Sequence, residues 1–523
     1  MRRISASDAI FLDLETPNAP LSIGGLMVLD PSTAPGSFVR HRDILQYVET
    51  RLHLAPNLRR KLVYHPLGLD EPRLIDDPDF DLEFHVRHIG LPKPRDWRQL
   101  KILTSRLISR PMDMHRPLWE MYIIEGLEEL EGVPDDAFAV LMKMHHAVFD
   151  GAAAGATMWT FMQDAPDYEP LPPEKRWVPE REPDMLGWTV SSLQEGFKQW
   201  VDNVKALPEM GKGLAASAKT GAKGGNLADS FRGMLAPKTR FQQPVTSHRV
   251  WDFVSLPMVE MQALRTALGK PKMNDLILAI IAGGLRRYLN KHGELPEKPL
   301  YSFCPINVRE GNPIDGGNYV SGMRVSLATD IADPLERLRA ITESSLGGKA
   351  QATAIGGDFF AHLLAMTPYP LRHRVLGEML SMPEKFDMET PAIANVVISN
   401  SPPPRGGHYF TGAKVICSAG YGPILNLSGV FHAITGLDFE STISVTSCRE
   451  IMPDIAFYMD CIRASFEDMK EAAAGMAAAA AETKPEAAKP EASKAAPKRK
   501  PTVKKPAARR KPAARKATPK KSG

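Results

Sequence analysis

A chain of 523 residues with 43% apolar and 24% charged residues can fold into two or three domains with sizeable cores. This composition excludes a fibrous or wholly disordered protein. The net charge of +4 is unevenly distributed: residues 471–523 hold 15 Lys or Arg and four Glu, so they carry +11 and the preceding part of the chain carries −7.

The cysteine pattern and the absence of targeting segments indicate a cytoplasmic protein. Cys304, Cys417, Cys448 and Cys461 are widely spaced and form no CxxC pair, which favours a reducing compartment over a disulfide framework. The N-terminus lacks the apolar core of a signal peptide, and no window approaches the ~20 apolar residues of a membrane span. We expect contact with a membrane, if any, to be peripheral.

The first hundred residues predict alternating helices and strands. The segment Ser5-Ala6-Ser7-Asp8 is placed to cap a short helix through residues 9–12, and residues 22–29 form an apolar strand. Residues 80–89 alternate in polarity, which predicts another strand. Residues 97–110 carry leucines at helical spacing, which predicts a helix.

A Pro-Leu-Trp segment, Pro117-Leu118-Trp119, predicts a turn followed by a tryptophan that packs in the core. Residues 121–126 then form a strand that pairs as a hairpin with an apolar strand at residues 138–144. The residues directly after the second strand of this hairpin, 145–151, are therefore expected at a strand end.

The heptad HHAVFDG, residues 145–151, follows that strand. Histidine has an unperturbed pKa near neutrality, so a positioned His146 could accept a proton at working pH. Asp150 could fix an imidazole or the local backbone, and Gly151 permits a sharp exit. Two other interpretations are a pair of packed histidines and a metal site of His145, His146 and Asp150. The metal site is disfavoured because adjacent side chains on a strand point to opposite faces.

Residues 166–245 read as a crossover linker, because their first part is rich in Pro, Glu and Asp. Within the linker, Leu186 to Leu207 has apolar residues at helical spacing. This amphipathic helix either packs on its own protein or faces a membrane or lipid-droplet surface.

Residues 246–470 form the second predicted domain. Asn274-Asp275 occupies a position suited to a helix N-cap, before a buried helix. Strands are expected at residues 425–432 and 437–446, and a final helix at 455–469.

These motifs, in this order, resemble the bacterial wax ester synthase/diacylglycerol acyltransferase family, within the HHxxxDG superfamily of CoA-dependent acyltransferases. The resemblance runs from about residue 4 to 470 and rests on the opening SASDAIFLDLETPNAPLSIGG, on Pro117-Leu118-Trp119, on the heptad, on Asn274-Asp275 and on NVVISNSP at 395–402. The turn that follows, Pro403-Pro404-Arg405, departs from the family's glycine-rich ending.

The resemblance implies an α/β (α+β) fold of two chloramphenicol-acetyltransferase-like domains, 1–165 and 246–470, with mixed sheets flanked by helices and an active-site channel between them. It implies that His146 is the general base, that His145 is secondary, and that Asp150 and Gly151 shape the site. The residues expected at the substrate-binding part of the site are Pro117, Leu118, Trp119, Asn274 and Asp275. Neither a metal nor a bound cofactor is expected, and acyl-CoA is the co-substrate.

Residues 471–523 are rich in Ala, Lys and Pro and nearly devoid of large apolar residues, which predicts a disordered tail. Its basic part, residues 484–521, could bind nucleic acid without sequence preference or an anionic lipid surface. It could equally be a solvated appendage.

The sequence therefore predicts an O-acyltransferase that moves a long-chain acyl group from acyl-CoA to diacylglycerol, to a long-chain alcohol, or to both. Such apolar products imply work at the inner membrane or at lipid droplets. The alternatives are an enzyme of the same fold with another acceptor, and a droplet-associated tether that acts through its basic tail.

Overall fold

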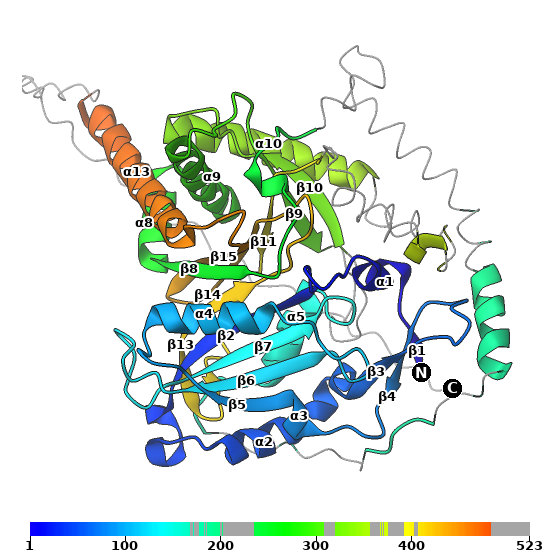
Figure 1. The fold of residues 1–523 in the computed structure, drawn as a ribbon. Coiled ribbons are helices and arrows are strands. Elements are labelled where there is room, and N and C mark those ends of the chain that lie inside the picture. Colours follow the sequence, from blue (N-terminus) through cyan, green and yellow to red (C-terminus); the bar gives the residue numbers. More distant parts are fainter. Residues whose placement is uncertain are drawn as a thin grey trace, which may run out of the picture. The chain divides into compact units, whose positions relative to one another are not determined.

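The structure, a computed structural model, describes residues 1–167, 235–307, 320–355, 392–401 and 406–482, with parts of 171–205 and 367–374. Residues 1–477 form one compact unit. In the described part of this unit, two six-stranded mixed sheets and one small sheet carry the fold (Figure 1).

The N-terminal sheet has the order β12-β13-β2-β7-β6-β5. Its strands are antiparallel except for the parallel pair β5 and β6. The bounds are β2 (Ser22–Asp30), β5 (Val86–Gly90), β6 (Trp119–Glu125), β7 (Phe138–His145), β12 (Tyr409–Phe410) and β13 (Ala413–Tyr421).

The C-terminal sheet has the order β10-β9-β11-β14-β15-β8. Its strand β11 is parallel to both neighbours, and the other pairs are antiparallel. The bounds are β8 (Arg249–Pro257), β9 (Tyr301–Asn307), β10 (Val320–Ser326), β11 (Val396–Asn400), β14 (Phe431–Leu437) and β15 (Glu440–Cys448).

A small antiparallel sheet, β1-β4-β3, and the helices complete the described fold. The small strands are β1 (Arg2–Arg3), β3 (Arg60–Val63) and β4 (Arg73–Asp76). The α-helices are α1 (Ala6–Asp13), α2 (His41–Glu49), α3 (Leu82–His85), α4 (Trp97–Ile108), α5 (Gly151–Thr160), α8 (Met258–Ala267), α9 (Met273–Lys291), α10 (Pro334–Ile355) and α13 (Ile455–Glu482).

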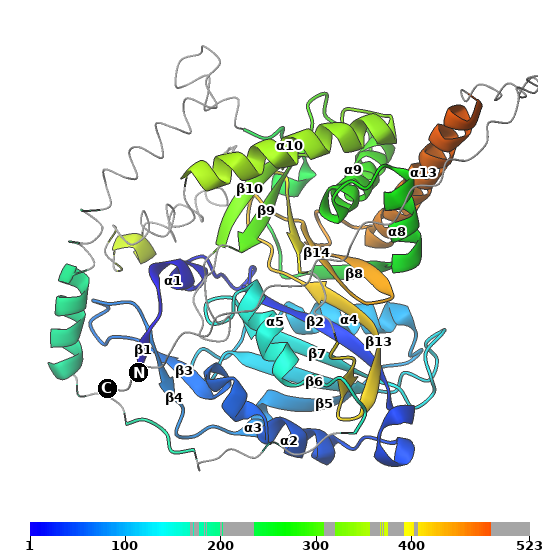
Figure 2. The ribbon, with the colours of Figure 1, turned by 180° about the vertical axis from the view of Figure 1, so that it is seen from behind.

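Strand β7 is buried over its whole length because the N-terminal sheet is covered on both faces. Val140 and Met142 pack in one core with Ala154 of α5. The alternate residue Leu141 packs in a second core with Leu100 of α4. Figure 1 shows α4 in front of this sheet, and the reverse view in Figure 2 shows α5 in front of it.

The two large sheets meet where β13 lies against β14 and β15. Trp251 of β8 donates its indole N–H to the carbonyl of Gly420 at 2.9 Å, and Ser444 of β15 donates to the same carbonyl at 2.6 Å. The hydroxyl of Tyr421 reaches back to the carbonyl of Ile23 in β2 at 3.1 Å. The second core therefore extends from the N-terminal sheet into the seam between the sheets.

Several predicted elements are confirmed. Ser5 caps α1 in a capping box with Asp8, and β2, α4 and the β6–β7 hairpin lie where the sequence placed them. The prediction of two mixed sheets flanked by helices is confirmed.

Other predictions are wrong. The expected strand at 80–89 is instead the short helix α3 followed by β5, because the Asp81 side chain caps a helical turn through the N–H of Glu83. The strand expected at 425–432 begins at residue 431. Strand β13 was not foreseen, and it places residues 413–421 of the second predicted domain in the first sheet.

The C-terminal boundary also differs from the prediction. Helix α13 continues to Glu482, so the predicted tail does not begin at residue 471. The alanine run after residue 471 explains the extension, since Ala has the highest helix propensity. The rest of the predicted tail, and its expected disorder, lie outside the described residues. No helix within the described residues is both long enough and apolar enough to cross a membrane.

Candidate active site

The two motif histidines lie at the end of β7, where neighbouring strands fix the backbone. His145 is the last residue of the strand, and its N–H donates to the carbonyl of Leu118 at 3.0 Å. The next N–H, of His146, donates to the carbonyl of Leu21 at 2.9 Å. The neighbouring segments at Leu118 and Leu21 therefore fix the backbone from which the two imidazole side chains project.

The His145 ring is held by two hydrogen bonds that define its tautomer. Its Nδ1 accepts from the N–H of Ala147 at 3.1 Å, so that nitrogen carries no proton. Its Nε2 therefore carries the proton and donates to Oε2 of Glu15 at 3.0 Å. Both ring nitrogens of His145 are therefore engaged, and its side chain is buried.

His146 occupies a different environment. It is half-buried, and its ring stacks on the ring of Phe11 at a centroid distance of 3.9 Å and an angle of 13°. Phe11 lies in α1, and Glu15 follows α1 directly. One short helix and the turn after it thus position both imidazoles.

A buried ion cluster fastens α1. Arg372 donates from Nε to Asp13 of α1 at 3.0 Å and from both terminal nitrogens to the carboxylate of Glu71, each at 2.8 Å. Burial raises the pKa of the Glu71 carboxyl, and the bidentate arginine opposes that shift. The exposed His373 adds a contact to Asp13 at 2.7 Å.

Asp150 and Gly151 form the start of α5. Asp150 is the N-cap, and its buried carboxylate accepts from the N–H of Ala153 at 2.7 Å. The structural role expected of Asp150 stays a prediction, which this cap contact supports. The backbone of Gly151 is not in the left-handed region, so the expected sharp exit does not explain this glycine. It is exposed, and a Cβ added there would meet no atom within 4 Å.

The Pro-Leu-Trp segment is part of the core. Leu118 and Trp119 are fully buried, and the Trp119 indole donates to the carbonyl of Leu58 at 2.7 Å while stacking on His85. The packing expected of Trp119 is confirmed. Pro117, Leu118 and Trp119 are all buried, and a substrate-binding role for them stays a prediction.

Asn274 and Asp275 lie in the first turn of α9, whose N-cap is Lys272, so neither residue caps the helix as expected. The side-chain oxygen of Asn274 accepts from the amide of Asn400 at the end of β11, at 3.1 Å. Two motifs far apart in the sequence thereby meet. Asp275 is fully buried, and desolvation raises the pKa of its carboxyl.

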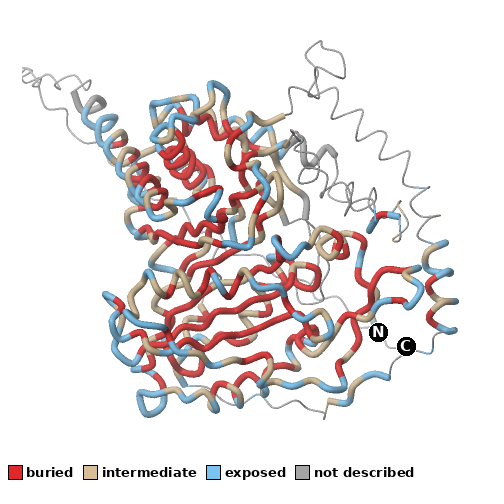
Figure 3. The backbone as a smooth tube through the Cα atoms, viewed as in Figure 1, coloured by how far each residue is buried: buried red, intermediate tan, exposed pale blue. Residues whose placement is uncertain are grey.

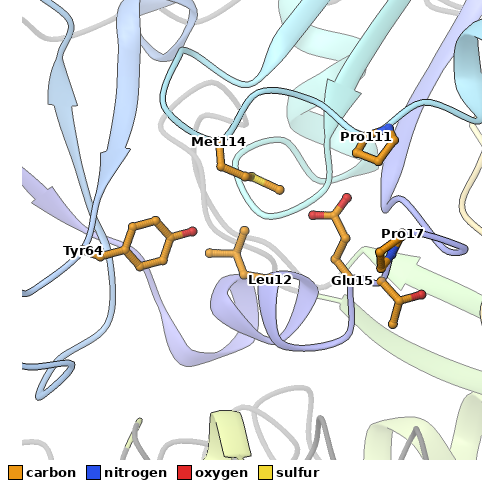
Figure 4. Close-up of a pocket in the computed structure, with 7 residues that line it drawn as sticks. Leu12, Glu15, Pro17, Tyr64, Pro111 and Met114 are labelled. Carbon is orange, nitrogen blue, oxygen red and sulfur yellow. The ribbon is translucent and has the colours of Figure 1, made fainter.

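A pocket of about 260 Å³ is lined in part by Glu15, whose carboxylate holds His145. Figure 4 shows Glu15 at one side of it and Tyr64 at the other, with the Tyr64 hydroxyl directed toward Leu12. All its lining residues come from the first predicted domain: Leu12, Glu15, Thr16, Pro17, Tyr64, Pro111 and Met114. The channel expected between the domains stays a prediction.

Among the described residues, no group of three or more His, Cys, Asp or Glu side chains is arranged to hold a metal ion. His145 and Asp150, two of the ligands in the metal interpretation, instead bond to Glu15 and to the backbone of α5.

Sequence reasoning missed three residues that shape the site: Phe11, Glu15 and Arg372. The capped helix at the start of the chain was recognised, but nothing local indicates that a strand 130 residues later lies against it. Arg372 is harder still, because a single arginine in a segment without clear periodicity gives no signal of its carboxylate partners.

Comparison with known proteins places this architecture. The chain resembles the wax ester synthase/diacylglycerol acyltransferase from Marinobacter aquaeolei VT8, with a TM-score of 0.63, 24% identity, and coverage of 91% of this chain and 100% of that one. It also resembles the starter condensation domain of rhizomide synthetase, solved with C8-CoA and Leu-SNAC, with a TM-score of 0.50, 14% identity, and coverage of 90% and 94%. The fold is therefore that of the two-sheet acyltransferases and condensation domains.

Sequence comparison gives the family itself. The wax ester synthase/diacylglycerol acyltransferase catalytic domain matches residues 4–277, and the C-terminal domain of the same family matches residues 316–470. A putative diacylglycerol O-acyltransferase of Mycobacterium tuberculosis is 31% identical over 461 residues, 87% of each chain. The chain belongs to this family and is an acyltransferase, which confirms the resemblance found in its motifs.

Proposed function

We propose that this protein transfers a long-chain acyl group from acyl-CoA to the hydroxyl of diacylglycerol, of a long-chain alcohol, or of both. Family membership supports the reaction class, and the engagement of both nitrogens of His145 supports the assignment of roles. Since His145 is held by Glu15 and Ala147, His146 is left as the base of the pair.

In the proposed mechanism, an imidazole nitrogen of His146 accepts the hydroxyl proton while the alcohol oxygen attacks the thioester carbonyl. The tetrahedral intermediate then collapses, the C–S bond breaks, and the imidazolium returns its proton to the CoA sulfur. The products are an ester and free CoA thiol. No covalent enzyme intermediate is required, because a thiol of pKa about 8.5 is a good leaving group.

Stacking on Phe11 supports this role of His146. A ring held face to face at 3.9 Å can rotate little, so its nitrogens keep a fixed direction. The open space over Gly151 supports close approach of a substrate to the start of α5, since any larger residue there would occupy that space.

Asn274 is the proposed donor to the oxyanion. Its side-chain oxygen accepts a hydrogen bond from Asn400, which fixes the plane of the Asn274 amide. The NH₂ group of Asn274 then points away from Asn400 and is the proposed donor to the oxyanion. Asp275 supports the same turn from within the core rather than contacting substrate.

The proposed co-substrate is long-chain acyl-CoA, with no bound cofactor. The acceptors are apolar lipids, so we propose that the protein works in the cytoplasm at the surface of the inner membrane or of lipid droplets. Nucleic-acid binding through residues 484–521 remains a separate proposal, supported only by their charge.

The test is release of CoA thiol from palmitoyl-CoA, with diolein or hexadecanol as acceptor. The wild type is compared with His146→Ala and with the control His248→Ala, which removes an exposed histidine of the second half. We expect acceptor-dependent release in the wild type and control, and its loss in His146→Ala.

Equal release by all three proteins would remove His146 from the mechanism. Release with neither acceptor would favour an acyltransferase for another nucleophile, or a tether that acts through the basic tail.

A further inference from the structure

The helix at residues 186–198 exposes its apolar side. Leu186, Val190, Leu193 and Phe197 recur at spacings of four, three and four residues, so they form one stripe along the helix. These side chains are 50% to 79% exposed. In an ordinary surface helix this stripe would face the core.

The opposite side of the same helix is fixed to the protein by polar groups. Ser192 is buried and donates to Asp70 at 2.8 Å, and Arg73 donates to the hydroxyl of Ser192 and to Glu195 at 3.2 and 3.1 Å. Trp188 is also buried on this side, edge-on to His65. The helix therefore cannot rotate its apolar stripe inward without breaking the bonds of Ser192 and Glu195 to the Asp70–Arg73 ion pair.

The loop between β3 and β4 extends the apolar surface. His65 of this loop contacts Thr189 of the helix at 3.2 Å, which places the loop beside it. Leu67 and Leu69 on the same loop are exposed. Figure 3 shows exposed positions in pale blue, and both this loop and the helix (teal in Figure 1) carry them.

Tyr64 connects this surface to the candidate active site. It begins the same loop and is partly exposed, yet it also lines the pocket that contains Glu15. Glu15 in turn holds His145. Tyr64 is thus shared by the loop of the apolar surface and by the pocket that contains Glu15.

We propose that the apolar stripe of residues 186–197 and the loop at 64–69, here called the docking face, bind a lipid surface and bring the acceptor lipid to the pocket. This deepens the proposed function and rests on it, because the occupant is argued from the side chain shared with a site for apolar acceptors. A lipid surface needs no matching shape, which suits a stripe of scattered large apolar side chains.

The test is co-sedimentation of the full chain with phosphatidylcholine vesicles that contain diolein. Salt at about 0.5 M screens any attraction of the basic tail. The variant is Val190→Glu with Leu193→Glu, and the matched control is Val259→Glu with Leu346→Glu, which charges two exposed apolar positions on α8 and α10.

We expect the docking-face variant to lower the vesicle partition coefficient at least ~10-fold and the control to leave it unchanged. Equal binding by both variants overturns the proposal. So does a change from dimer to monomer in the docking-face variant with unchanged vesicle binding, because the face would then bind a second copy. Should the double variant fail to fold, Leu193→Gln alone is expected to weaken binding ~3-fold.

A soluble assay separates this proposal from the proposed function. With a short acyl-CoA and a short alcohol, the docking-face variant should match the wild-type rate. Loss of vesicle binding with that rate intact supports the docking face. Vesicle binding that depends on the docking face, in a protein that transfers no acyl group, would refute the function and leave the docking face standing.

Discussion

Two buried histidines, one in each large sheet, show how the surroundings of a histidine at the candidate active site differ from those of a core histidine. His145 at the end of β7 and His432 in β14 are both almost fully buried. His432 contacts the hydroxyl of Tyr458 at 2.7 Å, and burial lowers its pKa to about 4. His145 instead donates to a carboxylate, and its sequence neighbour His146 lies beyond the strand, stacked on Phe11.

The difference lies in what surrounds each ring. A histidine in an apolar core with a hydroxyl partner stays neutral and serves packing. A histidine at a strand end, with a carboxylate partner and a partly exposed neighbour, orients a group that can react. The N-terminal sheet acquires this arrangement from α1, and in the described part of the chain His432 has no carboxylate contact of this kind.

The largest expected effect separates the two histidines by activity. His146→Ala should lower kcat by about 10²- to 10⁴-fold while leaving the unfolding midpoint nearly unchanged, since the side chain is half-buried. His432→Leu should leave kcat per folded molecule unchanged. Steady-state kinetics with thermal unfolding check both variants, and a loss of kcat in folded His432→Leu would erase the distinction.

Loss of Arg372 should affect only the N-terminal site. Arg372→Met leaves Asp13 and Glu71 buried without their cation, which costs about 3–5 kcal/mol of stability locally. Since α1 carries Phe11 and leads to Glu15, kcat should fall with it. Compared with the wild type, Arg372→Met should show faster amide hydrogen exchange in α1 but not in β14. Faster exchange in both elements, or in neither, contradicts the fastening of α1 by the buried ion cluster.

The pH dependence of stability should report His432. Its pKa is 6.5 when unfolded and about 4 when folded, so protons bind preferentially to the unfolded chain between these values. Stability is complete above pH 6.5 and falls by about 3 kcal/mol as the pH drops to 4. Urea unfolding should show that this part of the loss is absent in His432→Leu. An identical pH dependence of stability in the wild type and His432→Leu would refute the assignment of this loss to His432.

The smallest effect concerns Glu15. Glu15→Leu leaves Nε2 of His145 buried without an acceptor, at a cost of about 1–3 kcal/mol. Glu15→Gln keeps an acceptor oxygen and should lose less than half of that. Denaturant unfolding of the two variants measures the difference. Equal losses would mean that the charge of Glu15, rather than its hydrogen bond, supports His145.

The sequence identified the residues that share a local pattern. Strand β7, the two histidines and the Ser5 cap were predicted, because alternation, motif spacing and capping are all local properties. Asn274 was placed near a helix start but was misread as a cap, since Asn and Asp are preferred N-cap residues.

What could not be predicted depends on contacts between distant segments. Phe11 and Glu15 gain their meaning only when α1 lies against β7, and Arg372 only when it reaches Glu71. The exposed stripe at residues 186–197 was predicted as an amphipathic helix, but its outward orientation depends on the Asp70–Arg73 pair below it. Strand β13 was missed because its partner, β2, lies almost four hundred residues earlier.

That late strand has a consequence for biosynthesis. After β7 has been synthesised, the edge of β2 that pairs with β13 stays unpaired until β13 is made, roughly 270 residues later. At about 5–20 residues per second, this edge stays open for roughly 15–55 s, long enough for pairing with a neighbouring nascent chain. The nascent chain is therefore expected to need a chaperone during this interval. A fragment that ends before residue 413 is expected to aggregate.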